Sequence, residues 1–165
     1  MINIDKHTES GMLSLLPDKA GPVPAEVFSL TGNRTQIGPE TEALPSGLQL
    51  RFRPLDPDLA PPERRNRFTE AERDDILCLL ASPDGRFGSL RINAAVRIYT
   101  SRLGASQTIT FRPKSKEHLW LRALSGRLAL NGNEIEAGQD ATVSEEGELQ
   151  IFSPDGSEFV LLVLE

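Results

Sequence analysis

Glycine and proline interrupt this chain at short intervals along its whole length, and this spacing limits the folds that it can form. The 165 residues include 13 glycines and 12 prolines, and the apolar segments between them are short. Short apolar segments bounded by turn residues are typical of strands rather than of helices. No helix long enough to form a core and no internal repeat is visible in the sequence. We therefore expect an all-β fold.

Alternating apolar and turn residues mark the individual strands. In the segment 47–53, Leu48, Leu50 and Phe52 point to one side. The sequence Asn131-Gly132-Asn133 is a hairpin turn that tolerates positive φ at its centre. Eight or more strands, with about ten residues from turn to turn, favour a closed barrel or a double-sheet jelly roll. The other strands are expected at residues 1–4, 26–30, 76–81, 90–92, 96–103, 107–111, 118–124, 127–131, 134–137, 141–143, 148–153 and 158–164.

The segment 54–67 is rich in proline, so it is expected to be a connector outside the sheet interior. After it, Thr69-Glu70-Ala71-Glu72 has the form of a capping box and predicts one helical turn. The basic cluster Arg64-Arg65-Asn66-Arg67 is followed closely by acidic residues, which favours a solvated, self-compensating run of charges.

Net charge and the pattern of apolar residues exclude several kinds of partner. The formal net charge is −6, whereas nucleic-acid and anionic-membrane surfaces require clustered Lys and Arg. No apolar run approaches membrane-spanning length, and the N-terminus is polar and acidic. Cys78 is the only cysteine, so no intrachain disulfide is possible, and its apolar neighbours favour a buried, inert thiol. We expect a cytoplasmic protein without nucleic-acid or membrane partners.

Residues 119–132 resemble the strand–Gly–strand–Gly hairpin of a cupin barrel. Together with residues 79–85 and 88–92, they make the resemblance more specific within the cupins. From about residue 47 to 165 the chain resembles the C-terminal cupin of bacterial pirin-like proteins of the quercetin 2,3-dioxygenase type. The resemblance implies a single cupin-type barrel, a double-stranded β-helix or jelly roll, over residues 47–165. Residues 1–46 would then be a short, irregular N-terminal extension, a remnant of a first cupin that pairs with the barrel edge or with a partner.

The resemblance also implies that this chain lacks the residues of the family's metal site. The family's metal site lies in the N-terminal cupin, in a His-x-His element followed by a further His and a Glu, and no His-x-His occurs here. Aligning the first cupin motif on Gly126 puts Leu119 at the Glu position and Pro113, Lys114 and Ser115 around the His-x-His positions. Aligning the second motif on Gly138 puts Gln150 near its histidine. We therefore expect no metal and no other cofactor.

The chain has only two histidines, His7 and His118. A site at His118 with Glu117 and a distant acid such as Glu145 would have one imidazole, where such sites use two or three. His7 of a second subunit would be the only source of a second imidazole. No catalytic residue is assigned, because the sequence has neither a nucleophile elbow nor a convincing carboxylate pair.

His118, Trp120 and Arg122 alternate along one strand and so share a face, opposite Leu119 and Leu121. We expect the leucine face to fill the barrel and the other face to point outward. Because aromatic residues and Arg are enriched in interface hot spots, a protein contact is favoured for that face. A capped surface Trp is the second interpretation, and a ligand pocket lined by Trp120, Arg122 and Tyr99 is the third.

These inferences lead to a metal-free, non-catalytic cupin module that acts through protein contact or small-ligand binding. We expect a homodimer formed through an exposed barrel face, because a chain that lacks one of the family's two barrels exposes the surface that the lost barrel would cover. The alternative is a metal-dependent oxidoreductase resembling quercetin 2,3-dioxygenase, with a depleted or intersubunit site. The sequence favours the non-catalytic module but leaves the question of enzymatic activity open.

Overall fold

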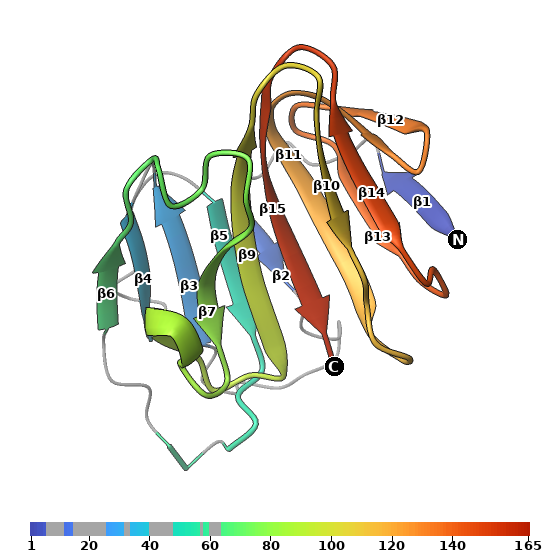
Figure 1. Cartoon of the computed structure of the whole chain (residues 1–165). Helices are drawn as coiled ribbons and strands as arrows, with labels where there is room; N and C mark the ends of the chain where they lie inside the picture. Colours follow the sequence, from blue (N-terminus) through green and yellow to red (C-terminus); the bar gives the residue numbers. More distant parts are fainter. Residues whose placement is uncertain (6–11, 15–25, 32–33, 40–47, 57, 60–63) are drawn as a thin grey trace. The chain divides into compact units, whose positions relative to one another are not determined.

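The computed structural model describes residues 1–5, 12–14, 26–31, 34–39, 48–56, 58–59 and 64–165 (Figure 1). The chain divides into two compact units. The larger unit comprises Met1–Thr8, Glu70–Leu79 and Val96–Glu165, and the smaller unit comprises Glu9–Thr69 and Leu80–Ala95. Strands dominate the described residues, as the glycine and proline spacing predicts, and the helical element among them is the short 3-10 turn η2 (Arg86–Gly88). None of these residues belongs to a helix with the length and apolar character needed to cross a membrane.

One long strand, β11 (His118–Leu130), takes part in both sheets of the larger unit. Its first half pairs with β13 and β15, and its second half pairs with β12 and β14. The pairing with β15 shifts register between Ala123 and Ser125, and Gly126 follows with φ of 71°. A β-bulge of this kind bends a strand, which allows β11 to pass from one sheet into the other. The other strands of the unit are β1 (Ile2–Asp5), β9 (Val96–Leu103), β10 (Gln107–Phe111), β12 (Asn133–Glu136), β13 (Asp140–Val143), β14 (Leu149–Ser153) and β15 (Ser157–Leu164).

The core of the larger unit consists of alternate side chains that face inward from both sheets. Leu119 and Leu121 come from the first half of β11, and Leu128 and Leu130 come from its second half. Each of them is at most 2% exposed, and burial of a leucine stabilises the fold by about 1.5–3 kcal/mol. The leucine face of β11 therefore fills the barrel, as expected. The remaining core residues are Leu103, Ala123, Ile135, Ala141, Val143, Leu149, Ile151, Phe159, Leu161 and Val163.

The smaller unit contains a five-stranded sheet in the order β2-β5-β3-β4-β6. Leu48, Leu50 and Phe52 are buried on one side of β5, which confirms the alternation read from the sequence. They share this core with Phe28 and Ile37. The strands are β2 (Met12–Ser14), β3 (Glu26–Thr31), β4 (Arg34–Pro39), β5 (Leu48–Phe52), β6 (Arg64–Arg67) and β8 (Leu90–Arg91), while β7 (Cys78–Ser82) begins in the larger unit and ends in this one.

The division into units differs from the boundary expected at residues 46 and 47. β5 pairs with β3, so residues on both sides of that boundary share one sheet. The strands β2, β4 and β6 were not predicted, and β6 lies at the end of the segment that was expected to be a proline-rich connector. A proline-rich segment can lead into β6 because β6 is an edge strand of its sheet, where prolines are tolerated nearby. Residues 70–73 form a turn closed by a hydrogen bond from Arg73 N to Glu70 O, rather than the predicted helical turn.

Candidate functional site

A buried ion pair lies near the start of β9 and just before β11. Arg97 on β9 donates from Nη2 to Glu117 Oε1 and from Nη1 to the Tyr99 hydroxyl, the latter at 3.1 Å. The side chains of Arg97 and Glu117 are 11% and 6% exposed. The ring of Tyr99 meets that of Phe111 edge to face, with centroids 6.0 Å apart. This arrangement places one charged pair and one phenol beside an apolar interior.

The opposite face of the same sheet carries a second buried ion pair. Arg122 donates from Nε to Asp140 Oδ1 at 2.5 Å and from Nη2 to Asp140 Oδ2 at 2.7 Å. Its guanidinium carbon also lies 5.4 Å from the ring centroid of Trp120, a cation–π contact. The side chains of Arg122 and Asp140 are 7% and 8% exposed. The pair is a bidentate, desolvated contact, and it holds the guanidinium group beside the Trp120 ring.

The structure corrects part of the expectation for this face. His118 is exposed, but Trp120 is 5% and Arg122 6% exposed, so Trp120 is not left in water. The expectation that the side chains of Trp120 and Arg122 point outward is therefore wrong. The sequence showed that these residues share a face, but it did not show that both faces of the central strands are buried. On β15, which pairs with β11, the successive residues Val160, Leu161, Leu162 and Val163 alternate between the two faces, and each is 0% exposed.

Tyr99 is not brought together with Trp120 and Arg122. Tyr99 pairs with Leu161, and Leu161 pairs with Leu121, so Tyr99 lies on the core face of the sheet. Trp120 pairs with Leu162 on the other face. A single ligand pocket lined by all three predicted residues is thus excluded by the register of the strands.

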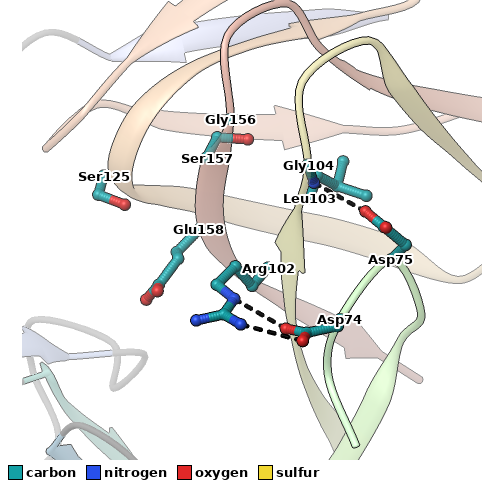
Figure 2. Close-up of a pocket in the computed structure, with 9 residues that line it drawn as sticks. All are labelled: Asp74, Asp75, Arg102, Leu103, Gly104, Ser125, Gly156, Ser157 and Glu158. Atoms are coloured by element: carbon teal, nitrogen blue, oxygen red, sulfur yellow. Dashed lines mark hydrogen bonds and ion pairs between the residues drawn. The ribbon is translucent and has the colours of Figure 1, made fainter. Parts of the chain in front are cut away.

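The larger unit also has an open pocket of about 400 Å³ (Figure 2). It lies where the β9–β10 turn, the β14–β15 turn and the bulge of β11 meet residues 74 and 75. Figure 2 shows that polar side chains dominate its lining, with Leu103 as the apolar residue. The lining residues are Asp74, Asp75, Arg102, Leu103, Gly104, Ser125, Gly156, Ser157 and Glu158.

Each charged side chain of this pocket already has a polar partner, and Glu158 pairs with Arg73 at 3.1 Å. Arg102 donates from Nε and Nη2 to the two oxygens of Asp74, at 2.7 and 2.9 Å, and from Nη1 to Glu70 at 3.0 Å. The hydrogen bonds to Asp74 are the main reason that the pKa of Arg102 is raised above its ordinary value. Asp75 accepts from the backbone N of Gly104 at 2.7 Å. Glu70 and Asp74 therefore pair with Arg102, a partner far along the chain that the expected local charge run did not foresee.

The described residues do not offer a donor set for a transition metal. In this part of the chain, no group of three or more His, Cys, Asp and Glu side chains is placed to hold an ion. Glu117 is paired with Arg97, and it forms no such group with His118 and Glu145. His7 lies outside the described residues. Iron, nickel and copper sites built on imidazole need more nitrogen donors than His118 alone provides.

The thiol of Cys78 on β7 is expected to react slowly. Burial is the main cause that raises the pKa of its thiol, and the nearby Glu72 carboxylate raises it further. Since the thiolate is the reactive form, we expect native protein to react with a disulfide reagent more slowly than free cysteine at neutral pH. The rate should increase as the pH approaches the raised pKa, and Glu72→Gln should accelerate the reaction at neutral pH. A neutral-pH rate equal to that of free cysteine would contradict this assignment.

The sequence did not identify Arg97, Glu117 and Asp140 as members of ion pairs. Arg97 and Glu117 are 20 residues apart, and Arg122 and Asp140 are 18 apart. No local spacing indicates either pair. Arg97 does alternate with Tyr99 on one strand, which was the available signal for their shared face.

The two sheets joined through β11 around an apolar interior define a cupin-type protein. The comparisons agree with this class, because a model of the quercetinase C-terminal cupin domain matches residues 79–164, just over half of the chain. The chain belongs to the quercetinase C-terminal cupin domain family. The resemblance inferred from the hairpin at residues 119–132 is confirmed, although the matched segment begins at residue 79 rather than 47. No curated protein matches the sequence.

Solved structures show the same fold at low sequence identity. The bacterial pirin YhhW from Escherichia coli, in complex with nickel(II), has a TM-score of 0.74 and 18% identity, over 86% of this chain and 72% of that one. The protein YhaK from Escherichia coli has a TM-score of 0.66 and 13% identity, over 88% and 77%. Quercetin 2,3-dioxygenase from Acinetobacter baumannii has a TM-score of 0.58 and 16% identity, over 86% of this chain but 63% of its own. At these identities the likeness concerns the fold alone.

Proposed function

We propose that this chain is a metal-free, non-catalytic cupin module that acts through protein contact or small-ligand binding. The observation that carries the proposal is the filling of the barrel. Leu121, Leu149, Ile151 and Leu161 are 0% exposed in its interior, where a bound ion or substrate would need space and polar donors. Arg97 and Glu117, the charged side chains near the start of β9, are paired with each other.

The positions that the cupin metal motifs would use support the same proposal. Leu119, aligned with the motif's Glu, is buried in the core. Lys114 and Ser115, near the His-x-His positions, are exposed, and Gln150, near the second motif's His, is also exposed. None of these side chains is a good transition-metal ligand, and their burial pattern does not point them to a common centre.

Protein contact is favoured over small-ligand binding. The pocket in the larger unit is open, and its charged groups already have polar partners, so a small ligand would have to compete with existing ion pairs and hydrogen bonds. A protein partner needs no enclosed cavity, since its affinity comes from a few desolvated anchors on an extended surface.

Elemental analysis of protein purified without a nickel column tests the proposal. We expect substoichiometric iron, copper, nickel and zinc, no consumption of quercetin under oxygen, and no change of either result in His118→Ala. The competing function is a dioxygenase like the quercetin 2,3-dioxygenase whose fold this chain shares. Stoichiometric metal that is lost in His118→Ala, or flavonol turnover by the wild type, would establish that alternative and exclude ours.

A further inference from the structure

A rigid loop in the smaller unit presents a phenylalanine to solvent. Phe87, in η2 between β7 and β8, is 92% exposed. Its φ is 55°, in the left-handed region that bulky side chains rarely adopt, and it lies between Gly85 (φ 67°) and Gly88 (φ 76°). A bulky residue in this conformation is strained by about 1–3 kcal/mol. Neither the exposure nor the strain of Phe87 is explained by packing within this unit.

The loop is held in this conformation by a buried serine at its base. Ser82 is 0% exposed, and its hydroxyl bonds to Asp84 at 3.0 Å, to Ser89 at 2.8 Å and to the backbone N of Arg86 at 3.2 Å. The Ser82 carbonyl accepts from Gly85 N and Ile92 N. These bonds fix the loop before any partner arrives, so little conformational entropy would be lost on binding.

Arg86 and Arg91 belong to the same region of the smaller unit as Phe87. Arg86 precedes Phe87, and the Cβ of the exposed Arg91 lies 3.4 Å from where a Cβ at Gly85 would be. Gly88 O accepts a hydrogen bond from Asn66 Nδ2 at 3.2 Å, which joins the loop to β6 and its exposed Arg65 and Arg67 (Figure 1). Arg86 also lowers the pKa of Asp84 to about 2, so the one acid of the loop stays ionised and paired at neutral pH.

We propose that this surface, Phe87 with Arg86 and Arg91, docks an acidic segment of a partner protein, with an apolar group of the segment against Phe87 and its carboxylates on the arginines. The inference rests on the proposed function, in that it names the kind of partner a non-catalytic module would contact. Aromatic residues and Arg are the residue types enriched in interface hot spots, whereas Lys is depleted. The smaller unit has eight arginines and one lysine.

Symmetry favours a separate acidic protein over a second copy of this chain. A second copy could offer its larger unit, which has 15 acidic and nine basic residues, whereas the smaller unit has nine of each. However, that contact would join two different surfaces of the same chain, and such head-to-tail contacts produce open filaments unless the rotation closes.

Selection from a phage-displayed library of random short peptides tests the proposal on the whole chain. We expect enriched peptides that combine Asp or Glu with an apolar residue, and their affinity should decrease as salt increases. Phe87→Ser should weaken binding at least about tenfold, as expected for a hot spot, and Arg91→Glu should also weaken it. Phe152→Ser is the matched control, because Phe152 is an exposed phenylalanine of the larger unit and should be neutral.

Three results would overturn the proposal while leaving the proposed function intact. The first is that acidic peptides are enriched no more strongly on the wild-type protein than on the Phe87→Ser protein, provided that the thermal unfolding of Phe87→Ser is unchanged. The second is a dimer mass by light scattering that becomes the monomer mass in Phe87→Ser, which would make the occupant a second copy. The third is binding of a single-stranded thymidine oligonucleotide that depends on Phe87. Metal content and quercetin turnover, which test the proposed function, are independent of all three.

Discussion

Replacing Arg122 with methionine is expected to lower the free energy of unfolding by about 3–5 kcal/mol, because the Asp140 carboxylate would stay buried without its counter-ion. The substitution also removes the guanidinium that lies over the Trp120 ring. Urea unfolding followed by circular dichroism and by the fluorescence of Trp120, the single tryptophan, measures the loss.

A double substitution separates the charge effect from a packing effect. Arg122→Met with Asp140→Leu should recover most of the loss, since replacing a buried ion pair by apolar groups of similar volume is often neutral. The control is Arg127→Met, which breaks a pair with Asp155 whose side chains are 46% and 74% exposed. That change should alter stability by no more than about 0.5 kcal/mol. Equal losses for Arg122→Met and Arg127→Met would show that burial of the Arg122–Asp140 pair is unimportant.

Gly126→Ala is expected to destabilise the chain by at least about 3 kcal/mol, through steric overlap added to backbone strain. A Cβ at Gly126 would lie 2.2 Å from the carbonyl oxygen of Gly156 and 3.0 Å from Cα of Ser157. Both are backbone atoms of the opposing segment, so the clash cannot be relieved by turning a side chain. The site follows the bulge at which β11 passes between sheets, and we expect a lower midpoint of urea unfolding.

Gly132 provides a matched control for Gly126. It has φ of 85°, and a Cβ there would have no neighbour within 4 Å, so Gly132→Ala introduces strain without overlap. We expect it to destabilise the chain by about 1 kcal/mol. A loss for Gly126→Ala as small as that for Gly132→Ala would mean that β15 moves away from β11 at little cost, contrary to the tight approach seen here.

Local pattern was sufficient to locate most strands of the larger unit. The segments 96–103 and 107–111 match β9 and β10 in full. The two segments predicted around Ser125-Gly126 are halves of the single strand β11. Residues 125 and 126 were left between these two segments, whereas here Gly126, with φ of 71°, directly follows a β-bulge within one strand. In the smaller unit, β2, β4 and β6 were missed. β2 and β6 are short edge strands, and β4 ends in Gly38 and Pro39, which indicate a turn in the sequence.

The burial of Trp120 and Arg122 could not be predicted from the strand itself. Alternation shows that these residues share a face, but it does not show whether that face meets water. The partner of Arg122 lies on β13, a strand that β11 meets only after the chain has turned back. The same limit applies to Phe87, since a Gly-Arg-Phe-Gly sequence indicates a turn and says nothing about which side chain the turn exposes.

The sequence alone determined the all-β class, the apolar face that fills the barrel and the family, because these depend on short-range alternation and on the order of turns. The tertiary structure decided which faces are buried, which distant charges pair, and that Tyr99 and Trp120 lie on opposite sides of one sheet. Those features depend on strand register and on contacts between segments far apart in the chain. A register is set by many pairings at once, and no single segment encodes it.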